Sequence, residues 1–123
     1  MRFLMTFGPL KAAAGTDIEG PSYAVGPQPV RVLSVHLSPS DAVTADASNF
    51  VTFSLVNGST TLASWSTQTS AQGALTADTP VDLTVTRSAA VVPAGGQLKA
   101  IVVNTASGQA VEAGLTAWCE LMN

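Results

Sequence analysis

The sequence predicts an all-β protein, an antiparallel β-sandwich or barrel with about seven or eight strands. Short alternating or β-branched segments recur along the chain, turn residues separate them, and no long segment has the 3.6-residue period of a helix. The chain has 123 residues, enough for one domain, and 46% of them are hydrophobic against 11% charged. This balance favours a folded chain over a disordered one.

Residues 1–29 are predicted to form an extended N-terminal arm, separate from a β-sandwich domain at residues 30–123. The arm holds four of the seven prolines and four of the ten glycines, which is too dense for a helix or a central strand. Ordering it costs on the order of 30 kcal/mol at about 1 kcal/mol per residue. Offsetting that cost takes about 1,200 Å² of apolar burial, so we expect the arm to dock on a neighbouring subunit or another protein.

The β-pattern begins at residue 30. Strands are predicted at residues 30–37, 49–57, 60–66, 81–86, 89–92, 98–104 and 111–121. In the second of these, Val51, Phe53 and Leu55 share one face. Asn57-Gly58 predicts a type I′ hairpin, because both central residues of that turn need positive φ.

Two further expectations concern the connections. The last two strands, at residues 98–104 and 111–121, are expected to pair with each other across a turn at residues 105–109. Residues 40–49 are the one segment that could form a helical turn, capped by Ser40 or Asp41.

The charge pattern excludes several classes of partner. A net charge of −3 gives no electrostatic footprint for nucleic acid or an anionic membrane. No apolar run approaches the roughly 18 residues of a membrane-spanning helix. Residues 47–77 contain no charged side chain. That stretch is either a solvated sheet surface or a partner surface, and the low charge favours a partner surface, since uncharged polar groups cost less to desolvate than ions.

The nucleophile and base candidates are few. The single histidine, His36, lies in a predicted strand, and a catalytic triad would need a serine and a carboxylate to converge on it. No Gly-x-Ser-x-Gly motif is present, so His36 is interpreted as a structural or surface residue. The single cysteine, Cys119, is interpreted as a buried small hydrophobe.

The acidic residues fit turns and exposed strand positions better than a site. The spacing of Asp41, Asp46, Asp78 and Asp82 matches no EF-hand calcium loop. The carboxylates at residues 112 and 120 lie some 27 Å apart along one strand, too far for an acid–base pair. The sequence therefore predicts no catalytic, metal or cofactor site, and no enzyme.

The aromatic residues leave two interpretations open. Trp65 and Trp118 with Tyr23 could form a sugar-stacking platform. Tryptophans in strands also serve as core or subunit-contact residues, which is the favoured interpretation here.

Three motifs follow one another in a fixed order over about half of the chain. ADASNFVT at residues 45–52 leads into the strand that ends at Asn57-Gly58, and GALTADTP at residues 73–80 precedes VDL at residues 81–83. VVPAGGQL follows at residues 91–98. An Asn-led strand, an Ala-Gly-rich middle loop and an Ala-Gly-x-x-Leu turn in this order resemble the small jelly-roll-like β-sandwich proteins of tailed bacteriophages, especially head decoration or cement proteins.

The resemblance implies a non-enzymatic virion structural protein that binds the outer surface of an assembled phage capsid and stabilises it. It would be made in the host cytoplasm, act as a homotrimer and contact the major capsid protein, with no cofactor, nucleic acid or membrane. The contacts expected from the arm are Phe3, Phe7 and Tyr23, because large apolar anchors dominate interface energy. The alternative is a β-sandwich module of a phage tail or fibre that binds host glycans, which requires Trp65 or Trp118 to be exposed in a groove.

Overall fold

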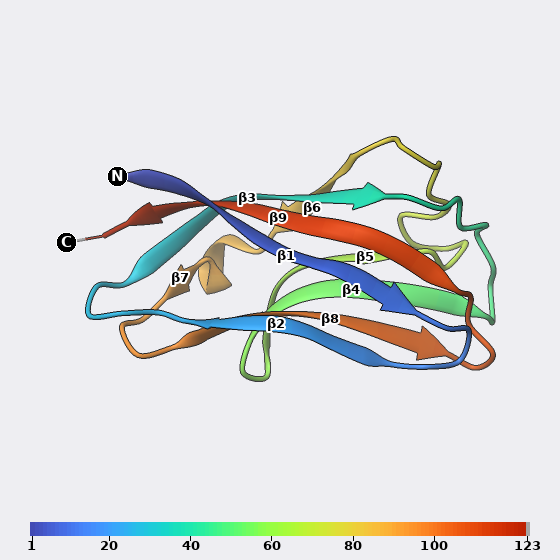
Figure 1. Ribbon diagram of the computed structural model, residues 1–123, viewed down its shortest axis with the longest axis horizontal. Helices are drawn as coiled ribbons and strands as arrows, with labels where there is room; N and C mark the ends of the chain where they lie inside the picture. The colour runs from blue at the N-terminus through green and yellow to red at the C-terminus, as the bar shows by residue number, and fades with distance from the viewer. Residues whose placement is uncertain (123) are drawn as a thin grey trace.

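The computed structural model describes residues 1–122 and shows an antiparallel sheet of nine strands that nearly closes into a barrel (Figure 1). The predicted all-β antiparallel class is confirmed. The strands are β1 (Arg2–Ala12), β2 (Ile18–Ala24), β3 (Val30–Pro39), β4 (Phe50–Asn57), β5 (Thr60–Ser66), β6 (Val81–Val85), β7 (Val91–Val92), β8 (Gln97–Thr105) and β9 (Val111–Leu121). One short 3-10 helix, η1 (Arg87–Ala89), precedes β7.

The strand order is β1-β9-β3-β6-β5-β4-β8-β2, with β7 paired to β3 outside this path. Figure 1 shows the two layers, with β1, β9 and β3 above and β4, β8 and β2 below. Strand β6 links them, because Val81–Leu83 pair with β3 whereas Thr84 and Val85 pair with β5. The sheet therefore turns a corner within β6.

The core fills the space between the two layers. Alternate residues of β4 and β9 point into it, as the period-2 patterns predict. Val51, Phe53 and Leu55 are fully buried on β4. From β9 the buried residues are Val111, Ala113, Leu115, Ala117 and Cys119.

The connections between strands confirm one prediction and correct two. The β4–β5 hairpin forms at Asn57-Gly58, where Gly58 has a φ of +60°. The predicted helical turn at residues 40–49 is wrong, since this segment instead makes isolated bridges from Val43 to Leu75 and from Asp46 to Gln68. The predicted β8–β9 pairing is also wrong, because β8 pairs with β4 and β2 while β9 pairs with β1 and β3. The turn after β8 carries the chain across to the opposite layer.

Residues 1–29 are part of the sheet rather than an arm apart from it. Strand β1 pairs with β9, β2 pairs with β8, and these two strands form the ends of the strand order. Proline is tolerated in edge strands because one side of the strand needs no N–H donor, which accommodates Pro9 and Pro21. Leu10 is fully buried and packs over Gly20, where a Cβ would lie 2.5 Å from the leucine Cδ2. The boundary expected at residue 29 therefore does not divide the core.

Candidate functional site

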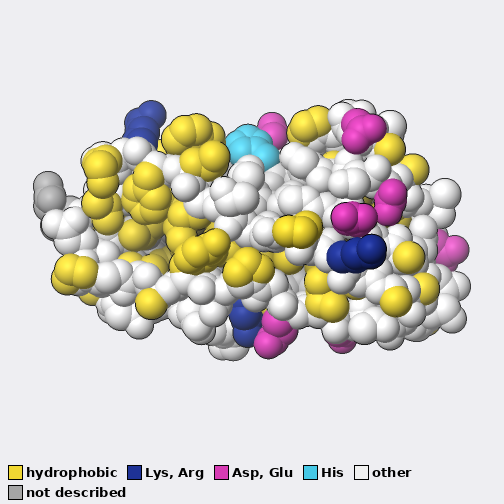
Figure 2. Space-filling view, in the orientation of Figure 1, with side chains coloured by type: hydrophobic (Ala, Val, Ile, Leu, Met, Phe, Trp, Pro, Cys, Tyr) yellow, Lys and Arg dark blue, Asp and Glu magenta, His cyan; other side chains and the backbone are white. Residues whose placement is uncertain are grey.

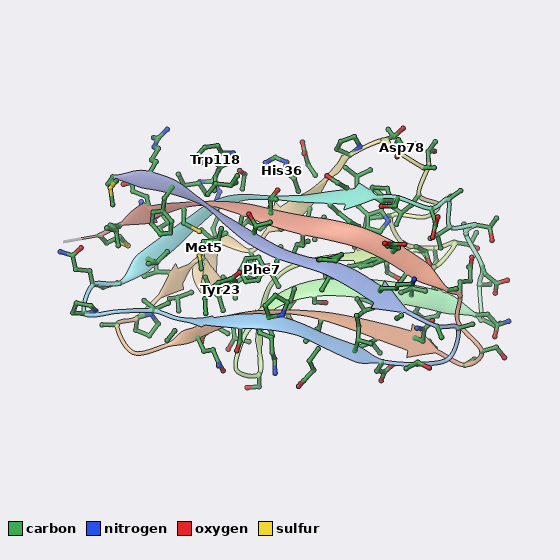
Figure 3. All side chains as sticks on the ribbon, viewed as in Figure 1. Met5, Phe7, Tyr23, His36, Asp78 and Trp118 are labelled. Atoms are coloured by element: carbon green, nitrogen blue, oxygen red, sulfur yellow. The ribbon has the colours of Figure 1, made fainter. Side chains whose placement is uncertain are left out.

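The three aromatic residues expected to anchor a partner occupy different environments. Phe7 is fully buried in the core, so its side chain offers no surface to a partner in this conformation. Phe3 is half-buried and packs against the same core. Tyr23 is partly exposed on β2, and its hydroxyl donates a hydrogen bond to the Thr6 carbonyl at 2.7 Å. Figure 3 shows Phe7 and Tyr23 next to each other between β1 and β2.

The two tryptophans differ sharply in exposure. Trp65 packs against the core, and its Nε1–H donates to the Gly73 carbonyl at 3.1 Å. Trp118 is 44% exposed on the outer face of β9. Its cross-strand neighbour on β1, Leu4, is 48% exposed on the same face. Two large apolar side chains are thus exposed next to each other on the surface.

One hollow opens beside Trp118, and a second adjoins it at Leu33 and Ser34. The smaller, about 350 Å³, is lined by Arg2, Leu33, Ser34 and Trp118. The larger, about 720 Å³, lies where β6 leaves β3, and it shares Leu33 and Ser34 with the smaller one. The register of β3 against β9 shifts at Leu33, because Val32 pairs with Cys119 and Ser34 pairs with Trp118. This bulge forms the common wall of the two hollows.

This surface, the Trp118 face, is made of Arg2, Leu4, Leu33, Ser34 and Trp118. Figure 2 shows hydrophobic side chains concentrated over the end of the molecule that holds both termini, with acidic side chains mainly toward the other end. All three arginines of the chain line the two hollows, Arg2 in the smaller and the other two, Arg31 and Arg87, in the larger. The Trp118 face therefore combines exposed apolar side chains with one arginine.

A chain of hydrogen-bonded polar side chains borders the Trp118 face. His36 Nδ1 lies 2.6 Å from Asp82 Oδ1, and His36 Nε2 lies 3.1 Å from Ser34 Oγ. Ser34 and His36 are two residues apart on β3, and His36 is directly opposite Asp82 on β6. Figure 3 places His36 beside Trp118 on the same side of the molecule. The convergence that the sequence could not supply, of a serine and a carboxylate on His36, is present in the fold.

Two of the other acidic residues, Asp46 and Glu120, make local contacts. Asp46 accepts backbone N–H groups of Ser48 at 2.8 Å and Asn49 at 2.7 Å, and these bonds hold the pKa of its carboxyl below the usual value. Glu120 lies 3.5 Å from Arg2, across the β1–β9 pair. Within residues 1–122, no three His, Cys, Asp or Glu side chains gather closely enough to hold a metal ion.

Cys119 lies on the inner face of β9 and is fully buried, as the sequence indicates. Burial raises the pKa of its thiol to about 11. The described part of the chain also contains no helix long and apolar enough to cross a membrane.

Comparison with known proteins assigns no family. No family model matches the sequence, and no curated protein matches it. A chain in a solved structure of infectious bursal disease virus, Gt strain, aligns with 96% of this chain at 15% identity and a TM-score of 0.38. The alignment covers 30% of that viral chain, so this protein spans less than a third of its length. A likeness this distant carries no functional assignment.

Proposed function

We propose that this chain is a virion structural protein, a decoration or cement protein that binds the outer surface of an assembled phage capsid and stabilises it. The observation that carries the proposal is the exposed pair Leu4 and Trp118 on one sheet face. Contiguous exposed apolar side chains on a small folded domain mark an interaction surface, since burying them in the core or covering them with a partner is favourable. The motif order of residues 45–98 supports the same role.

In this proposal the contact with the major capsid protein runs through the Trp118 face rather than through a detached arm. Phe7 is committed to the core, and Trp118 takes the role of the large aromatic anchor. A protein that binds only the assembled shell stabilises that shell by mass action. The proposed homotrimer would place three copies of this face around a symmetry axis of the capsid.

The first test is the copy number of the chain in gradient-purified virions, measured by quantitative mass spectrometry against the major capsid protein. A ratio near one-to-one, or a simple fraction of it, supports a protein that covers the whole shell. A few copies per particle would place the chain in the tail or fibre. Absence from the particle would overturn the virion role.

The second test asks whether the Trp118 face makes the contact. Trp118→Ala should weaken co-sedimentation with capsids that lack the protein by at least about tenfold, because a buried aromatic anchor contributes about 2 kcal/mol or more. Val103→Ser is the matched control, since Val103 is 38% exposed on β8, in the other layer. Equal loss in both variants, or no loss in Trp118→Ala, would contradict a contact through this face.

A second function is favoured by one observation, the hollow beside Trp118. A tail or fibre module that binds host glycans needs an exposed tryptophan in a groove, and Trp118 lines a hollow of about 350 Å³ with Arg2. An indole face stacks on the apolar side of a sugar ring, while the guanidinium supplies hydrogen-bond donors. Binding to purified host surface glycans that is lost in Trp118→Ala, with capsid binding absent, would support this function in place of the first.

A further inference from the structure

Two hydrogen bonds link the side chains of Ser34, His36 and Asp82 in a row. Which group donates in each bond follows from the chemistry of the carboxylate. An ionised carboxylate only accepts hydrogen bonds, so Asp82 Oδ1, at 2.6 Å, places the ring proton of neutral His36 on Nδ1. The other nitrogen, Nε2, then has a free lone pair. Ser34 Oγ lies 3.1 Å from Nε2 and donates its proton to that lone pair. A general base, the carboxylate that orients it and a nucleophile have this same relationship in serine hydrolases.

The backbone explains why the three side chains meet. Ser34 and His36 share the outer face of β3, because residues two apart on a strand point the same way. Asp82 is the direct cross-strand partner of His36. The bulge at Leu33 brings Ser34 into register with Trp118, so the serine lies on the wall of both hollows. Ser34 thus borders open space that a substrate can enter.

We propose that Ser34 is the nucleophile of a hydrolytic site for carboxylic esters, with His36 as general base and Asp82 as the residue that positions it. Ser34 Oγ attacks the ester carbonyl carbon while its proton passes to His36 Nε2. The C–O bond to the alcohol breaks, and the alcohol leaves with that proton, giving an acyl-serine. Water then attacks the acyl-serine through the same base, which releases the carboxylic acid and restores Ser34. One ester and one water give one acid and one alcohol.

The lining of the smaller hollow indicates the class of ester. Trp118, opposite Ser34, offers a flat apolar surface to a ring in the acyl or alcohol part. Arg2 lines the same hollow, and guanidinium N–H groups stabilise the negative oxygen of a tetrahedral intermediate. The site therefore fits an ester with a flat ring next to the ester bond, such as an aryl ester.

The openness of the site sets the expected rate. The Asp82 side chain is 83% exposed and that of His36 is 33% exposed, so water screens the charge that orients the base. We expect slow turnover, and the acyl-serine step is best detected by covalent labelling.

The test uses an alkyl fluorophosphonate, which forms an Ser Oγ–P bond with loss of fluoride and a proton. Intact-mass and peptide mass spectrometry should find the label on Ser34. Ser38 is the matched control, because it lies on the same strand and the same face, two residues beyond His36. His36→Gln should reduce the labelling rate by about a hundredfold, the usual contribution of a general base, and Asp82→Asn by a smaller factor. Equal labelling of Ser34 and Ser38, or an unchanged rate in His36→Gln, would overturn the proposal.

Hydrolysis of p-nitrophenyl acetate provides a second readout. An exposed imidazole attacks this activated ester by itself, so Ser34→Ala measures the contribution of His36 alone. The wild-type rate should exceed that of Ser34→Ala and match that of Ser38→Ala. All four substitutions lie on the surface, and an unchanged midpoint of urea unfolding confirms that the variants are folded. Asp82 lies outside the Trp118 face, so Asp82→Asn should keep full capsid binding while its labelling rate falls. Failure of this proposal and failure of the structural role are therefore separate results.

Discussion

Phe7 and Tyr23 join the two ends of the strand order through their side chains. Phe7 is on β1 and Tyr23 on β2, and their rings meet edge to face, with centroids 5.1 Å apart and an angle of 83° between the planes. The Tyr23 hydroxyl adds a bond to the Thr6 carbonyl of β1. The barrel is therefore closed at this point by an aromatic contact and one hydrogen bond in place of a strand ladder.

Truncating Phe7 should destabilise the whole domain. Phe7→Ala removes a fully buried ring from the core, and such a change costs about 3–5 kcal/mol. Urea unfolding followed by circular dichroism should show a lower midpoint with an unchanged slope. Phe3→Ala, on the same strand but half-buried, should cost less. A midpoint that does not move in Phe7→Ala would restore the view that residues 1–29 are independent of the core.

The sequence predicts features that are decided locally, and the structure confirms them at particular residues. Asn57-Gly58 specifies its own turn, and the alternation in β4 and β9 specifies which face is buried. The edge position of β1 and β2 was not predicted, because prolines exclude a central strand without distinguishing an edge strand from a free arm. Recognising the edge strands requires knowing that β1 pairs with β9 and that β2 pairs with β8.

The candidate site depends even more on long-range register. His36 and Asp82 are 46 residues apart, and they meet only because β3 and β6 pair with His36 opposite Asp82. A shift of one residue would turn the Asp82 side chain toward the core. No local pattern encodes that register, so the sequence offered His36 without its partners. The exposure of Trp118 also follows from its outward position on β9, between residues that face the core.

Cys119 should be inert to thiol reagents in the native state. Its thiol is buried with a pKa raised to about 11, so almost no thiolate exists at pH 8. Reaction with an aromatic disulfide reagent should be slow in buffer and fast in unfolding concentrations of urea. Fast reaction without denaturant would contradict the packing of β9 against the core.

The buried Cys119 thiol should also cause a loss of stability at alkaline pH. In the unfolded chain the thiol releases its proton near the ordinary value of 9.0, whereas the folded chain holds it to about 11. The unfolded state therefore binds fewer protons between these values, and the free energy of unfolding falls as pH rises through this window. Cys119→Ala removes this contribution, so its stability should fall less between pH 9 and pH 11. Parallel pH profiles for the two proteins would contradict the burial of the thiol.

Asp46 should contribute a loss of stability at acidic pH, in contrast to Cys119. Backbone N–H groups of Asn49 and Ser48 lower its folded pKa below 3.8, so its contribution is present above that pH and is lost as pH falls through the folded value. Carbon-detected NMR should give a titration midpoint for Asp46 below 3.8. Asp46→Ala should remove both bonds and weaken the turn before β4, whereas Asp41→Ala is the control, since the described residues make no hydrogen bond to its carboxylate. Equal effects of the two substitutions would show that the Asp46 bonds do not stabilise the turn.

Trp118 should account for most of the quenching of tryptophan fluorescence by a soluble quencher. Trp65 packs against the core and donates to the Gly73 carbonyl, whereas Trp118 is 44% exposed, so acrylamide should quench mainly Trp118. Trp118→Phe should lower the quenching constant and shift the remaining emission to shorter wavelength, and Trp65→Phe should raise the constant. A capsid or a glycan that binds the Trp118 face must cover this indole. Trp118 is one member of the exposed apolar pair and also lines the smaller hollow. Quenching of the Trp65→Phe variant should therefore fall when the true partner is added, and unchanged quenching in the bound state would move the contact to another face.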